Sequence, residues 1–219
     1  MPNIPSIESM KKMLPEDKYW PVNDVWGLHD FCIHSAQGAS GFMNAVNRYG
    51  KASDLQDFCK KAQMVNMENH KAMFESFVGA QSNGMLMWMS QSAWPNTVWQ
   101  TYDYYLDLTA GYYGCKKALE PLHILWDSQL DKVKVANNTR QGYKNLIAEV
   151  RIYNMDGTLM LRDSVRLESG SDTVTDCMSI VYPKKLSPVH FIKLELKDGN
   201  KRQAAKARTH QKIHVLAVK

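Results

Sequence analysis

Two kinds of side chain in this sequence could act on a ligand: a histidine next to a carboxylate, and a dense run of aromatic rings. His29 and Asp30 are adjacent and could together hydrogen-bond a polar substrate. Eight Trp or Tyr residues lie between Trp88 and Tyr113. Aromatic rings stack on the apolar faces of sugars, so Trp88 and Trp94 suit the floor or wall of a carbohydrate site. The alternative is that these rings only pack a core, where large aromatic side chains are common.

A metal site is a weaker hypothesis. His29, Cys32 and His34 form an H-x2-C-x-H cluster, but zinc would need a fourth ligand or a water and a fixed geometry. We expect this cluster to brace a loop and expect no metal and no cofactor. The four cysteines are too far apart for a zinc ribbon or a disulfide scaffold. No dinucleotide fingerprint, P-loop or G-x-S-x-G motif occurs, so nucleotide binding and serine hydrolysis have no support.

The positive charge of the chain is concentrated at its C-terminus. The net charge is +5, but six Lys or Arg residues and no acid follow Asp198, so residues 1–200 sum to −1. A nucleic-acid partner would therefore depend on the tail alone, and we expect none. No stretch approaches the ~20 apolar residues that span a bilayer. The first residues lack the apolar segment of a signal peptide.

In the first half of the chain, helical patterns surround one continuous apolar run. Short helices are predicted at residues 6–14, with Ser6 as N-cap, and at residues 109–120. Residues 15–50 are expected to be mostly irregular. The clearest helix covers residues 52–78, with a Met-rich apolar stripe expected in the core and a polar face opposite. Residues 84–89 lack alternation, which predicts a strand buried on both faces, as in a parallel sheet. Helix followed by buried strand is an α/β unit.

The second half changes to the two-residue period of strands. Alternation predicts five strands, at residues 132–136, 146–153, 158–165, 173–180 and 189–196. Asp156-Gly157 is a hairpin signal between two of them. Short strands at regular spacing are typical of an antiparallel β-sandwich. The pattern breaks after Asn200, so we expect residues 201–219 not to pack as a final strand.

The segment from Gly84 to Pro121 resembles the end of the (β/α)8 barrel of glycoside hydrolase family 2. The similar subgroup is the exo-β-D-glucosaminidases and plant-type endo-β-mannosidases. The matching motifs are Trp88-Met-x-x-Ser92-Ala-Trp94-Pro95, Trp99-Gln-x-Tyr102-Asp-Tyr-Tyr105, Gly111-Tyr-Tyr-Gly-x-Lys-Lys-Ala118 and, upstream, Val25-Trp-x-x-His29-Asp30. Val135-Ala-Asn-Asn-Thr139 resembles the first strand of that family's immunoglobulin-like domain.

This resemblance implies an α/β part followed by an all-β part. Residues 1–122 would be the C-terminal portion of a TIM (β/α)8 barrel, from after strand 7 through helix 8. Residues 123–200 would be an immunoglobulin-like β-sandwich, and residues 201–219 an aberrant basic tail. The active site of such a barrel lies at the C-terminal ends of its strands. Trp88, Trp94, His29 and Asp30 are therefore the candidate substrate-binding residues.

The resemblance also implies a retaining glycosidase acting on β-linked glucosaminides, mannosides or galactosides. In that family both catalytic carboxylates would lie upstream of Met1, so no catalytic residue is expected in this chain. We expect a fragment whose partners are a carbohydrate and the missing N-terminal part of the same enzyme. The enzyme would be periplasmic or secreted, with its signal peptide upstream. Two alternatives stay open: Asp30 or Asp103 performs the catalysis, or the chain is a non-catalytic carbohydrate-binding or scaffold protein using the aromatic residues from Trp88 to Tyr105.

Overall fold

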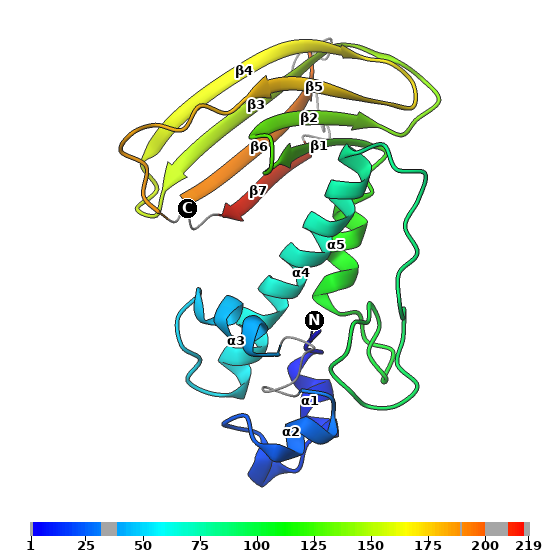
Figure 1. Cartoon of the computed structure of the whole chain (residues 1–219), viewed down its shortest axis with the longest axis vertical. Coiled ribbons are helices and arrows are strands. Elements are labelled where there is room, and N and C mark those ends of the chain that lie inside the picture. Colours follow the sequence, from blue (N-terminus) through cyan, green and yellow to red (C-terminus); the bar gives the residue numbers. More distant parts are fainter. Residues whose placement is uncertain (1, 32–38, 189, 200–209, 217–219) are drawn as a thin grey trace. The chain divides into compact units, whose positions relative to one another are not determined.

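The computed structural model describes residues 2–31, 39–188, 190–199 and 210–216 (Figure 1). The chain forms two compact units. The first contains Met1–Phe74 and Met85–Ala118, and the second contains Glu75–Gly84 and Leu119–Lys219. Helix α4 (Leu55–Gly79) continues from the first unit into the second. No helix within the described ranges is long and apolar enough to cross a membrane.

The helices of the first unit begin where the sequence provides caps. Besides α4, they are α1 (Ile7–Met13), α2 (Asp24–Leu28), α3 (Ala39–Asn47) and α5 (Ala110–Ala118), with a 3₁₀ turn at Glu16–Lys18. As predicted, the Ser6 hydroxyl accepts a 3.2 Å hydrogen bond from the Ser9 amide at the start of α1. Asp54 caps α4 in the same way, accepting from the Asp57 amide at 2.8 Å. These caps satisfy amide groups that have no partner within the helix.

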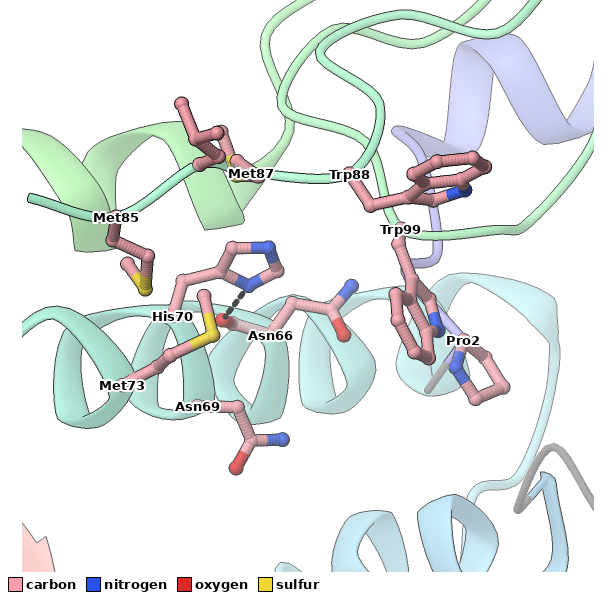
Figure 2. A pocket seen from close by; sticks show the side chains of 10 residues that line it. Pro2, Asn66, Asn69, His70, Met73, Met85, Met87, Trp88 and Trp99 are labelled. Carbon is pink, nitrogen blue, oxygen red and sulfur yellow. Dashed lines mark hydrogen bonds between the residues drawn. The ribbon is translucent and has the colours of Figure 1, made fainter.

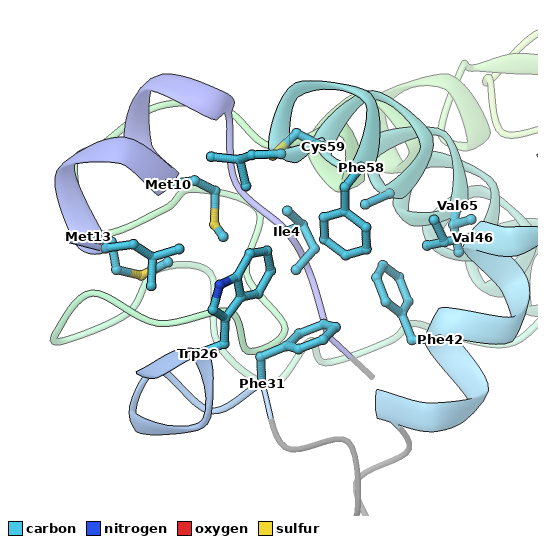
Figure 3. Packing of buried hydrophobic residues seen from close by; sticks show 13 residues of the cluster. Ile4, Met10, Met13, Trp26, Phe31, Phe42, Val46, Phe58, Cys59 and Val65 are labelled. Atoms are coloured by element: carbon cyan, nitrogen blue, oxygen red, sulfur yellow. The ribbon is translucent and has the colours of Figure 1, made fainter. Parts of the chain in front are cut away.

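The expectation that residues 15–50 are mostly irregular is wrong for α2 and α3. Both helices are short and contain a glycine, Gly27 or Gly41, which lowers helix propensity. Packing overrides this propensity: Trp26, Phe42 and Val46 are at most 1% exposed. Figure 3 shows them gathered with Phe31 and Phe58 in one core. The Trp26 and Phe58 rings meet edge to face, with centroids 5.5 Å apart.

Two glycines of α5 let its backbone approach α4 closely. A Cβ atom at Gly114 would overlap the Met67 carbonyl oxygen and lie 3.1 Å from the Lys71 amide nitrogen. A Cβ atom at Gly111 would lie 2.9 Å from the His70 ring. The Gly-Tyr-Tyr-Gly motif therefore fixes the separation of these two helices.

The strand predicted at residues 84–89 is not present. This segment is extended, but it pairs with no described strand, and Leu86 is fully exposed. A strand buried on both faces needs neighbours on both sides, and the described part of this chain provides none. The exposure nevertheless alternates: Met85, Met87 and Met89 are half-buried, whereas Leu86 and Trp88 lie on the open side.

The second unit contains two antiparallel sheets. The smaller sheet has the order β1-β2-β5, and the larger has the order β4-β3-β6-β7. The strands are β1 (Leu122–Asp127), β2 (Lys132–Asn137), β3 (Tyr143–Asn154), β4 (Leu159–Ser169), β5 (Thr173–Ser179), β6 (His190–Asp198) and β7 (His210–Leu216). All five predicted strands are present. Asp156-Gly157 forms the β3–β4 turn: Gly157 has φ +83°, and its amide donates to the Asn154 carbonyl at 2.9 Å.

One core joins the two sheets. Ile124, Val133 and Val135 of the smaller sheet cluster with alternate residues of β3 and β6, among them Val150 and Leu194. All of these are at most 1% exposed. The two sheets therefore bury their inner faces against one another, as expected for a sandwich.

The tail expectation is wrong for residues 210–216. They form β7, which pairs antiparallel with β6 in a register that places Ile192 opposite His214. β6 needs a hydrogen-bonding neighbour on its free edge, and the short apolar stretch at the end of the chain satisfies that need. Residues 200–209 and 217–219 lie outside the described residues.

The last turn of α4 packs with the β unit, so the expected first domain of residues 1–122 is interrupted at Glu75–Gly84. The buried Glu75 carboxylate lies 2.7 Å from the Nε2 atom of His123, a fully buried residue of β1. Leu125 packs directly over Gly79. The second unit therefore includes residues far upstream of its first strand.

Candidate functional site

Trp88 lies at the mouth of a cavity in the first unit. The cavity has a volume of about 310 Å³ between α4 and the segment that follows Gly84 (Figure 2). Its lining consists of Pro2, Asn66, Asn69, His70, Met73, Met85, Leu86, Met87, Trp88 and Trp99. The walls are therefore apolar, with two amides and one imidazole as polar groups. None of these ten described residues is a carboxylate, so the lining can bind a ligand but supplies no acid and no nucleophile for glycoside hydrolysis.

His70 is the titratable group of this cavity. Its Nδ1 atom lies 2.9 Å from the Asn66 carbonyl oxygen, one helical turn earlier (Figure 2). A carbonyl can only accept, so Nδ1 carries the proton and Nε2 keeps a lone pair. Burial lowers the pKa of His70, outweighing the bond to Asn66. The neutral ring is therefore the favoured form at neutral pH.

Sequence reasoning missed the α4 side of the cavity, because it assigned Asn66, Asn69, Lys71 and Glu75 to a solvated polar face. That assignment is wrong for Asn66, Lys71 and Glu75, which are at most 9% exposed. The Asn66 amide meets the buried Asn3 amide at 2.5 Å. Conversely, Met64, Met67 and Met73 of the apolar stripe are 39–45% exposed. The only available signal was the amide-rich spacing, which hydropathy alone treats as surface.

Trp94 and His29 form a second group outside the cavity lining. Their rings stack with centroids 6.1 Å apart and an interplanar angle of 27°. The His29 Nδ1 atom is 2.8 Å from the Pro95 carbonyl oxygen. The His29 carbonyl in turn accepts from the amide and the hydroxyl of Thr97, at 3.0 and 2.9 Å. The structure thus holds His29 against the Trp94 loop, a contact that the sequence did not predict.

The two carboxylates considered as alternative catalysts differ in their surroundings. Asp30 is half-buried and has a positive φ of 65°, a conformation that Asp tolerates better than most residues. Asp103 is 2% exposed, and its Oδ1 atom accepts from the amides of Tyr105 and Asp107 at 2.9 and 3.0 Å. Asp103 therefore braces its own turn. Cys32 and His34, the other members of the histidine–cysteine cluster, lie outside the described residues.

Comparison with known proteins gives consistent relatives. The chain is 34% identical over 166 residues to an exo-β-D-glucosaminidase of Amycolatopsis orientalis, covering 71% of this chain and 16% of that protein. It is 29% identical over 176 residues to a mannosylglycoprotein endo-β-mannosidase of Lilium longiflorum, covering 79% and 17%. The crystal structure of the Amycolatopsis orientalis exo-chitosanase CsxA matches with a TM-score of 0.83 and 28% identity, covering 100% of this chain and 26% of that one. No family model matches the chain.

The chain thus spans about a sixth of the length of these curated relatives and about a quarter of the solved structure.

Proposed function

Because the chain belongs to glycoside hydrolase family 2, with exo-β-D-glucosaminidases and β-mannosidases among its relatives, we propose that it supplies one wall of the sugar site of a β-glycosidase. The ligand is a β-linked hexoside: a glucosaminide, a mannoside or a galactoside. Trp88 and Trp94 are the stacking surfaces of this wall, and His29 and Asp30 are its polar groups.

The observation that best supports this proposal is the exposure of Trp88 on a well-braced segment. Its side chain is 75% exposed. Just beyond it, the Ser90 carbonyl accepts from the Thr101 and Tyr102 amides at 3.1 and 2.9 Å, which ties the loop to its return strand. Trp94 in that loop is 45% exposed. A fixed, exposed indole offers stacking area at little entropic cost, and exposed apolar patches mark binding surfaces.

We further propose a barrel and immunoglobulin-like architecture for the two units. The order of α4, the extended segment after Gly84 and α5 supports the end of a (β/α)8 barrel. In such a barrel Met85 and Met87 would face the helices, while Leu86 and Trp88 would face the interior. Sheets of three and four antiparallel strands around one core support the immunoglobulin-like domain.

Neither catalytic carboxylate of the reaction comes from this chain under this proposal. Retaining hydrolysis needs two carboxyl groups about 5–5.5 Å apart, one on each side of the scissile bond. Asp103 spends one oxygen on its own turn, and the cavity beside Trp88 has no carboxylate in its described lining. Loss of a general acid alone typically removes 10²–10⁴-fold of rate.

The first test measures hydrolysis by the purified chain. It is incubated with p-nitrophenyl β-glucosaminide, β-mannoside and β-galactoside, and release of nitrophenol is followed. We expect no turnover above buffer. Turnover that survives Trp88→Ala and disappears in Asp30→Asn or Asp103→Asn would overturn the proposal and make this chain a glycosidase of its own kind.

The second test measures binding by the same chain. One isolated wall should bind methyl β-glycosides weakly, with a Kd of about 1 mM or above, measurable by NMR chemical shifts of the Trp indole N–H groups. Trp88→Ala should weaken binding several-fold. Tyr113→Ala, which removes a 49% exposed aromatic ring of α5, is the matched control and should not change it. Micromolar binding without any other polypeptide would favour the alternative, a non-catalytic carbohydrate-binding protein.

A further inference from the structure

His29 is the one candidate sugar contact whose protonation state is readable from its surroundings. The Nδ1 atom lies 2.8 Å from the Pro95 carbonyl oxygen, which has no hydrogen to donate. Nδ1 must therefore hold a proton, and the neutral ring has its lone pair on Nε2. The bond to Pro95 thus makes Nε2 a hydrogen-bond acceptor.

Nε2 is also accessible. No described residue hydrogen-bonds to this atom, and it is not among the fully buried polar atoms that lack a partner. It lies on a ring that stacks beside the 45% exposed indole of Trp94. An acceptor next to an exposed aromatic surface suits the edge of a pyranose, whose donor groups project from the ring while its C–H face covers an indole.

Charged groups near His29 are few in the described residues. The preceding helix α2 contributes Asp24, and Asp30 follows His29 directly. The loop from Trp94 to Thr97 carries no charged side chain. None of these groups forms an ion pair with the ring within the described ranges. The charge that a bound sugar meets beside Trp94 is therefore set mainly by the ring itself.

We propose that His29 makes sugar binding at this wall pH-dependent according to the charge of the sugar. This rests on the proposed function, because it assumes a sugar beside Trp94. The neutral ring accepts a hydrogen bond from a hydroxyl or from the ammonium group of an amino sugar. In acid the ring gains a proton on Nε2, cannot accept, and repels an ammonium group. A hydroxyl still binds, because its oxygen accepts from the new N–H.

The experiment compares a cationic and a neutral ligand on the full 219-residue chain. Methyl β-D-glucosaminide and methyl β-D-mannoside are titrated at pH 7 and pH 5, and Kd is taken from Trp indole N–H shifts. We expect the glucosaminide Kd to rise about fivefold in acid, the ratio for two like charges at 4 Å in water. The mannoside Kd should change less than twofold.

Two variants assign the effect to the ring. His29→Gln keeps a polar side chain without a titrating ring, and His29→Phe keeps stacking on Trp94 without an acceptor. Both should bind the glucosaminide with the same Kd ratio between pH 7 and pH 5 as the mannoside, and this comparison also removes any titration of the ligand itself.

The outcomes separate this inference from the proposed function. If both sugars bind but the acid effect persists in His29→Gln, or the mannoside responds as strongly as the glucosaminide, the role of His29 is wrong and the sugar wall stands. If neither sugar binds the wild-type chain at either pH, both proposals are wrong.

Discussion

At the residue scale, the clearest electrostatic feature is Glu149 on the outer face of the larger sheet. This carboxylate is 4% exposed and accepts from Arg151, Arg162 and Lys197 at 2.6, 2.8 and 2.7 Å. Burial by itself would raise its pKa, but the hydrogen bonds from Lys197 and Arg151 outweigh burial and lower the pKa to about 2. The cations therefore favour the ionised form, and folding becomes linked to pH.

We expect this link to destabilise the second unit in acid. A carboxyl whose pKa is lower in the folded state contributes stability above its unfolded pKa of 4.5, and this stability is lost as pH falls toward 2. The loss should be about 1–2 kcal/mol between pH 6 and pH 3, less than the full pKa shift because solvent screens the exposed Arg162 and Lys197 side chains. Urea unfolding followed by far-UV circular dichroism at both pH values measures it.

Glu149→Gln tests the assignment. The variant should be less stable than wild type at pH 6 and should lose less stability on acidification. An unchanged acid response would show that other carboxylates, such as Glu195, account for the effect instead.

At the element scale, the crossing of α4 and α5 depends on the absence of a side chain at Gly114. The atoms that a Cβ would meet there are backbone atoms of Met67 and Lys71, which cannot rotate away. We expect Gly114→Ala to destabilise the first unit by about 2 kcal/mol or more, since overpacking shifts the backbone. Thermal unfolding monitored by Trp fluorescence measures this.

Gly41→Ala is the matched control, because Gly41 lies inside α3 with nothing within 4 Å of its Cβ position. It should be neutral or stabilise by about 0.5–1 kcal/mol through helix propensity. Equal effects of the two substitutions would contradict the close-contact explanation.

At the scale of the whole molecule, the two units have separate cores and should unfold separately. Five tryptophans lie in the first unit and Trp126 alone in the second. In Trp126→Phe, fluorescence therefore reports the first unit, while the β signal of circular dichroism reports the second. We expect the fluorescence transition at lower urea, since the first unit exposes Leu86, Trp88 and several methionines, whereas the two sheets bury their inner faces. Coincident transitions would show one cooperative fold.

Local rules in the sequence were enough to predict most elements. The caps at Ser6 and Asp54, the two-residue period of five strands and the Asp156-Gly157 turn are each decided by neighbouring residues, and the structure confirms them. The family relationship was also readable, because motifs such as Ser92-Ala-Trp94-Pro95 are local strings.

Only the tertiary structure decided which faces are buried and which residues meet. Residues 84–89 have the composition of a buried strand, yet a strand is buried only by neighbours, and none pairs with them here. The pairing of β7 with β6, the burial of Asn66 against Asn3, and the stacking of His29 on Trp94 join residues far apart in the chain. Periodicity describes one element at a time, so the sequence by itself determined the elements and the family, while long-range packing determined the site.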